Sequence, residues 1–126
     1  MLFRQLFDHE THTYTYLLAD EDTLEAILID PVLGQVKRDR LLIEQFNFKL
    51  IYILETHIHA DHITSAHILK KRFGAKTVLS ENAGVDCADI HATHGQILEF
   101  GAHRIEIRLT SGHTSSCQSF VVRNTD

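Results

Sequence analysis

The stretch LIYILETHIHADH, residues 50–62, decides how this chain folds and what it can bind. Its first five residues form a near-continuous apolar run, which favours a strand buried on both faces. Four potential metal ligands, His57, His59, Asp61 and His62, follow that strand within six residues. Imidazole and carboxylate groups together suit zinc or non-haem iron better than calcium or magnesium. The stretch therefore predicts a metal centre at the carboxyl end of a buried strand.

The spacing of these ligands allows one or two adjacent metal positions. His57 and His59 are two residues apart, so on an extended backbone their side chains point the same way. Asp61 and His62 follow where the chain turns towards a helix, and they can point to a second position. The alternative is a polar surface loop. That alternative is weak, because crowded ligand side chains gain little unless a cation lies between them.

A further candidate ligand is His113, in the stretch TSGHT at residues 110–114. Gly112 permits a tight turn, and the turn follows a predicted strand that ends at Leu109. We expect His113 to supply a third imidazole to the first metal position. The alternative is a loop histidine that caps the next segment.

The rest of the chain alternates strand and helix patterns. Aromatic, β-branched and apolar runs predict strands, and apolar residues at a spacing of three to four predict helices. Pro31 is expected to hold Asp30 in an extended conformation and to end a hairpin. The expected elements are strands at 13–19, 24–29, 50–55, 76–80, 96–100, 103–109 and 119–122, and helices at 36–46 and 63–73, with Gly74 as a helix stop. The pattern predicts a layered α/β or α+β sandwich.

The amino-acid composition argues for some classes of protein and against others. The 126 residues suit one small domain, residues 1–126, and 44% apolar with 23% charged residues is ordinary for soluble globular proteins. A net charge of -5 argues against nucleic acid as a partner, and no apolar run approaches the roughly 20 residues of a membrane span. Two cysteines make no disulfide framework, so we expect a cytoplasmic protein. The histidines expected at the surface are His9, His12, His67, His91, His94 and His103.

The motif Thr-His-x-His-x-Asp-His after a buried strand, with Gly-His-Thr further on, resembles the metallo-β-lactamase superfamily. Residues 14–18, 26–32 and 56–64 are similar to its persulfide dioxygenase branch, also called sulfur dioxygenase, which is close to the glyoxalase II thioesterases. The resemblance implies an α+β fold, the αββα sandwich, of which this chain looks like the N-terminal half.

The resemblance also implies ligands and chemistry. In the persulfide dioxygenase pattern, His57, His113 and a later Asp hold one Fe(II), and glutathione persulfide is oxidised to sulfite and thiol. Asp61 would hydrogen-bond a ligand and set its tautomer. In the glyoxalase II pattern, Zn(II) hydrolyses a thioester, with His57, His59 and His113 on one metal and Asp61 with His62 on another.

The later acidic ligand of the family has no match here, since only Asp126 follows His113 among acidic residues. The chain is then a fragment, a half-domain that pairs with its own copy, or a metal-binding member without turnover. A lone half-sandwich would leave an apolar sheet face uncovered, which predicts a homo-oligomer.

Overall fold

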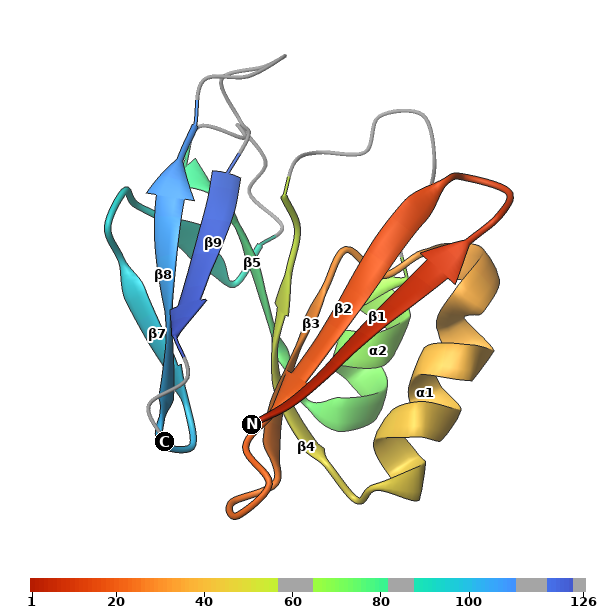
Figure 1. The fold of residues 1–126 in the computed structure, drawn as a ribbon. Coiled ribbons are helices and arrows are strands. Elements are labelled where there is room, and N and C mark those ends of the chain that lie inside the picture. Colours follow the sequence, from red (N-terminus) through yellow and green to blue (C-terminus); the bar gives the residue numbers. More distant parts are fainter. Residues whose placement is uncertain (57–64, 82–87, 111–117, 124–126) are drawn as a thin grey trace.

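The computed structural model describes residues 1–56, 65–81, 88–110 and 118–123. Within these residues a large sheet of six strands lies between two helices and a small sheet of three strands. Figure 1 shows the helices on one face of the large sheet and the small sheet on the other. This is the layered α+β arrangement that the sequence predicts.

The large sheet combines an antiparallel part with a parallel part. Its described strands are β1 (Leu2–Asp8), β2 (Thr13–Ala19), β3 (Glu25–Ile29), β4 (Lys49–Leu54), β5 (Lys76–Ser80) and β6 (Ile90–Ala92), in that order across the sheet. The first three strands pair antiparallel, and β3 to β6 pair parallel. Because parallel strands need crossover connections, β3 and β4 are joined through a short 3-10 turn (Leu33–Gln35) and α1 (Val36–Gln45), and α2 (Ala66–Phe73) lies between β4 and β5.

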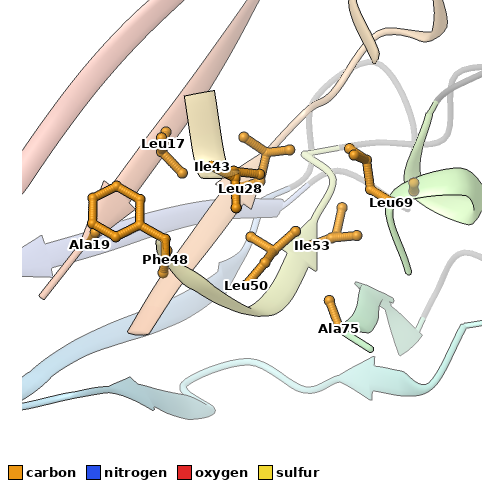
Figure 2. Packing of buried hydrophobic residues seen from close by; sticks show 11 residues of the cluster. Leu17, Ala19, Leu28, Ile43, Phe48, Leu50, Ile53, Leu69 and Ala75 are labelled. Carbon is orange, nitrogen blue, oxygen red and sulfur yellow. The ribbon is translucent and has the colours of Figure 1, made fainter. Parts of the chain in front are cut away.

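Each helix packs an apolar stripe on the outer face of the large sheet. Ile43 of α1 and Leu69 of α2 are fully buried against Leu28 and Ile53 of the strands, as Figure 2 shows. The helix α2 ends at Gly74, whose φ of 72° is the left-handed cap that glycine adopts without strain. The predicted glycine stop is therefore confirmed.

The small sheet covers part of the inner face of the large one. Its described strands β7 (Ile97–Phe100), β8 (His103–Leu109) and β9 (Gln118–Arg123) are antiparallel. Phe100, Ile105 and Ile107 pack on Ile27 and Leu54 in a second buried cluster. Leu54 faces this cluster while its neighbour Ile53 faces the helices, so β4 is buried on both faces, as its apolar sequence predicts.

Two carboxylates join the sheets at the end where β2 turns into β3. The backbone N–H of Ala102 donates to Asp20 at 2.8 Å, and that of Gly101 donates to Glu25 at 2.6 Å. His103 lies beside them with 4% of its surface exposed, and its Nε2 is 3.6 Å from an oxygen of Asp20. The expectation that His103 is a surface residue is wrong, because it shares the inward face of β8 with Ile105 and Ile107.

Most expected elements are present within one or two residues of the predicted bounds. The sequence pattern does not predict the strands β1 and β6, and residues 63 and 64 of the second expected helix lie outside the described residues. In the part of the chain that the structure describes, no helix is both long and apolar enough to cross a membrane.

Candidate metal centre

The five predicted ligands, His57, His59, Asp61, His62 and His113, all lie outside the described residues. They belong to two stretches, residues 57–64 and 111–117, here named the first and second ligand segments. The structure therefore shows what lies immediately before and after each segment. Those flanking residues are the points at which the two segments join the described part of the chain.

The residue before the first segment contacts the residue after the second. The backbone N–H of Gln118 donates to the carbonyl oxygen of Thr56 at 2.7 Å. The side-chain Nε2 of Gln118 donates to the carbonyl oxygen of Glu55 at 2.6 Å. The carboxyl end of β4 and the start of β9 are therefore held side by side. His57 directly follows Thr56, and the segment that contains His113 directly precedes Gln118, so both are connected to the described chain at this place.

The other end of the second segment is fixed as well. Leu109 is the register partner of Gln118 in the pairing of β8 with β9, so the segment joins two paired strands. The backbone N–H of Leu109 donates to the Nδ1 atom of His94 at 3.0 Å. His94 must keep this nitrogen unprotonated in order to accept, which fixes its tautomer. Described residues on both sides of the second segment are thus held by hydrogen bonds.

A buried aspartate anchors the start of the first segment. Asp30 is 7% exposed and accepts two hydrogen bonds from Thr56, one from the backbone N–H at 2.8 Å and one from Oγ1 at 2.7 Å. Its own backbone N–H donates to the carbonyl oxygen of Leu54 at 2.8 Å, and its carbonyl oxygen accepts from Thr15 at 2.8 Å. Asp30 therefore fixes the backbone immediately before His57.

The expectation that Pro31 keeps Asp30 extended is wrong. The φ of Asp30 is 55°, in the left-handed region that few residues other than glycine adopt. Aspartate tolerates this region better than most residues, because its short side chain can hydrogen-bond locally. The bonds to Thr56, Thr15 and Leu54 offset the preference that proline imposes on the residue before it. Backbone strain is therefore held next to the predicted ligands.

The donor set suits a transition metal. Four imidazoles and one carboxylate are the ligand types of zinc and non-haem iron sites. The hydrogen bonds of Asp30 and Gln118 supply the supporting contacts that such loops need for orientation. Among residues 1–56, 65–81, 88–110 and 118–123, no group of three His, Cys, Asp or Glu side chains is placed to hold a metal.

Sequence reasoning misses the three supporting residues. The pattern marks Asp30 only as the end of a hairpin, although an aspartate directly after a buried strand is a usable signal. His94 is expected at the surface, and it is indeed exposed, but its role as an acceptor depends on the β7–β8 register. Gln118 carries no local sequence signal, since its partners lie more than sixty residues earlier in the chain.

Known proteins share this fold and much of this sequence. The mouse protein named "Persulfide dioxygenase ETHE1, mitochondrial" is 42% identical over 125 residues, which cover 98% of this chain and 49% of the relative. A hydroxyacylglutathione hydrolase of Rhizobium meliloti (strain 1021) is 33% identical over 112 residues, which cover 87% of this chain and 43% of the relative. The crystal structure of ETHE1 from Myxococcus xanthus matches with a TM-score of 0.91 and 43% identity, over 97% of this chain and 54% of that one.

The chain thus spans about half the length of these relatives. The similarity to persulfide dioxygenases confirms the resemblance noted in the sequence, and the TM-score confirms the fold. A family model described as the metallo-beta-lactamase superfamily, whose members are metal-dependent, matches residues 10–126. The chain belongs to the metallo-beta-lactamase superfamily.

Proposed function

We propose that this chain supplies the first half of the metal centre of an iron persulfide dioxygenase that acts on glutathione persulfide. The overall reaction converts glutathione persulfide, dioxygen and water into glutathione, sulfite and two protons. The 42% identity to a persulfide dioxygenase over nearly the whole chain is the observation that carries the proposal. The hydrogen bond between Gln118 and Thr56 supports it, because it joins the residue before the first ligand segment to the residue after the second.

In this proposal His57 and His113 bind the iron, and an acidic residue beyond this half of the fold completes a triad. Iron(II) held there would supply the redox chemistry for oxygen transfer to sulfur. Asp61 would hydrogen-bond a neighbouring imidazole and set its tautomer. Asp30 and Thr56 hold the backbone from which His57 projects. The work of this chain is therefore to position the imidazoles.

The second candidate is a zinc-dependent thioester hydrolase of the glyoxalase II type. The 33% identity to a hydroxyacylglutathione hydrolase favours it, and so does the presence of five donors rather than two. Here His57, His59 and His113 would bind one zinc, and Asp61 with His62 would bind another. Zinc lowers the pKa of bound water to about 7, which supplies a hydroxide for attack on the carbonyl.

The third candidate is a metal-binding half-domain without turnover that pairs with its own copy. Its support is an exposed aromatic strip on the inner face of the large sheet, where Phe3 and Tyr14 are 56% and 48% exposed. A groove of about 300 Å³ runs from this strip to Phe120 and Val122 of β9. A second copy would cover this surface.

We also propose that this chain lies in the reducing cytoplasm, because it contains only two cysteines.

Metal analysis with two activity assays separates the three candidates. One iron per chain and oxygen uptake with glutathione persulfide support the dioxygenase. Two zincs and thiol release from a glutathione thioester without oxygen uptake support the hydrolase. Bound metal with neither activity, together with a dimer in light scattering, supports the half-domain. His57→Ala and His113→Ala should each empty the metal position, whereas the control His91→Ala, an exposed residue on β6, should not. Full metal content in both test variants would overturn the shared site.

Light scattering tests self-association of the chain at micromolar concentration. A dimer that Phe3→Lys dissociates would support pairing through the aromatic strip. Leu41→Lys is the matched control, because Leu41 is 48% exposed on the outer helix layer, away from the strip. A monomer, or a dimer that both substitutions leave intact, would contradict this pairing.

A further inference from the structure

The outer layer of the molecule carries a groove between α1 and α2. The groove has a volume of about 740 Å³, within the range of ligand-binding clefts. Its apolar part is formed by Val36 of α1 and by Ile68 and Phe73 of α2. Ile68 is 46% exposed, so the groove presents a large aliphatic side chain to solvent. None of the predicted metal ligands is among the described lining residues.

Helix periodicity explains why these residues face one another. Val36, Arg40 and Glu44 recur at intervals of four along α1, so they form one stripe. Ile68 and Arg72 have the same interval on α2. The stripe from residue 36 to residue 44 is roughly 12 Å long at 1.5 Å per residue. That length suits a short peptide segment better than a single small anion.

The groove is positively charged on a chain whose net charge is -5. Among the described residues that line it, four are basic, Lys37, Arg40, Lys71 and Arg72, and one is acidic, Glu44. Arg72 already pairs with Glu44 at 2.7 Å. Among the ion pairs of the described residues, none involves the three remaining cations. The groove therefore has unneutralised positive charge beside exposed apolar surface.

Arg40 gives a second, independent indication of a missing partner. Its Nε atom is buried and has no hydrogen-bond acceptor among the residues that the structure describes. A buried donor without an acceptor is costly, by about 1–3 kcal/mol in mutational data, and is rare in folded proteins. A carboxylate satisfies a guanidinium with short, charge-assisted hydrogen bonds. Because Arg40 lines the groove, an anionic oxygen bound there would be a suitable acceptor for its guanidinium group.

We propose that the groove between α1 and α2 binds an acidic amphipathic segment of a partner protein. Carboxylates of the segment would pair with Arg40, Lys37 and Lys71, and an apolar side chain would cover Ile68 between Val36 and Phe73. The reason for this choice is that an acidic segment complements the positive charge of the groove. A nucleic acid or an anionic membrane would extend beyond the groove, where its negative charge would meet the rest of a chain whose net charge is -5. The inference is independent of the metal chemistry proposed above.

The test uses two fluorescently labelled six-residue peptides and the whole chain, with binding followed by fluorescence anisotropy. One peptide alternates Glu with Leu, and the matched peptide replaces every Glu with Gln. The Glu peptide should bind at least about tenfold more tightly, and its affinity should fall when NaCl rises from about 50 to 500 mM, because exposed charges are screened. Equal affinity for both peptides, or no binding of either, would overturn the proposal.

Variants of the groove locate the binding. Arg40→Gln and Lys71→Gln should each weaken the Glu peptide by about fivefold or more, a typical cost of losing one charge pair. Lys71 is exposed, so its replacement leaves the fold intact, and circular dichroism checks Arg40→Gln. Lys76→Gln is the control, since Lys76 is an exposed lysine on β5 outside the groove. Equal loss in all three variants would mean non-specific attraction, and preferential binding of phosphatidylserine vesicles or duplex DNA would also refute the proposed occupant.

Discussion

The backbone N–H of Gln118 donates a hydrogen bond to the carbonyl oxygen of Thr56 at 2.7 Å. These residues are 62 positions apart in the chain, yet each is the described neighbour of one ligand segment. The small sheet is thereby tied to the large one at the carboxyl end of β4. A metal bound by both His57 and His113 would be a second link between these two parts of the chain.

Gln118→Ala should loosen this junction while leaving the backbone hydrogen bond possible. The variant loses the 2.6 Å bond from Nε2 to Glu55, in a residue that is 3% exposed. We expect a loss of about 1 kcal/mol in the free energy of unfolding, and about tenfold weaker metal binding by chelator competition. Gln45→Ala, at an exposed position on α1, is the control. Metal affinity equal to that of the parent chain would show that Gln118 has no part in holding the segments.

Asp30 offers a test that separates its carboxylate from its backbone conformation. Asp30→Ala removes both acceptors of Thr56 and places alanine at a φ of 55°, so a loss of about 2–4 kcal/mol is expected in urea unfolding. Asp30→Asn keeps one acceptor and tolerates the left-handed conformation, and should lose less. If both substitutions lower the free energy of unfolding equally, the side chain at this position does not relieve the backbone strain.

The sequence predicts the layers of this fold better than its edges. The central strands are predicted well, because an apolar run of five or six residues has few alternatives to a buried strand. The first strand, LFRQLFD, places its apolar residues in adjacent pairs rather than in alternation, so it shows no period of two. The sixth strand has only three residues, Ile90–Ala92, and its pairing with β5 is a tertiary effect.

The candidate site, like the fold, can be predicted from the sequence only in part. Ligand residue types and their spacing in residues 57–62 are visible in the sequence, because metal ligands cluster locally. The supporting contacts depend on register between distant strands, as with Gln118 and Thr56, and no local pattern encodes them. Asp30 shows a further reason, since the rule for residues before proline is overridden by hydrogen bonds that only the fold supplies.

Gly101 should resist substitution more than a glycine that also has a positive φ but lies in open surroundings. A Cβ atom there would overlap the carboxylate of Asp20, and its φ is 61°. Gly95 has a φ of 83° but open space where its Cβ would lie, so it isolates the cost of the conformation. We expect Gly95→Ala to lose about 1–2 kcal/mol and Gly101→Ala clearly more, as measured by urea unfolding. Equal losses would mean that the Asp20 side chain can move away from the added Cβ atom without lowering the free energy of unfolding.

The buried carboxyl of Asp39 predicts a pH dependence of stability. Asp39 lies on α1 with 1% of its surface exposed. Burial raises its pKa from 3.8 to about 6, although the Arg38 guanidinium, with Nε 3.1 Å from Oδ1, lowers it. Because the folded pKa lies above the unfolded value, the protonated carboxyl favours the folded state below about pH 4. That contribution is lost as the pH rises through 6.

Asp39→Asn should remove this dependence, because the amide resembles the protonated acid at every pH. The variant should match the parent chain near pH 4 and exceed its free energy of unfolding by on the order of 2 kcal/mol near pH 7. Urea unfolding at pH 4, 5, 6 and 7 measures the difference, and Asp22→Asn, at an exposed position, serves as the control. A difference between variant and parent that stays constant across this range would mean that Asp39 remains ionised in the fold, with Arg38 outweighing the cost of burial.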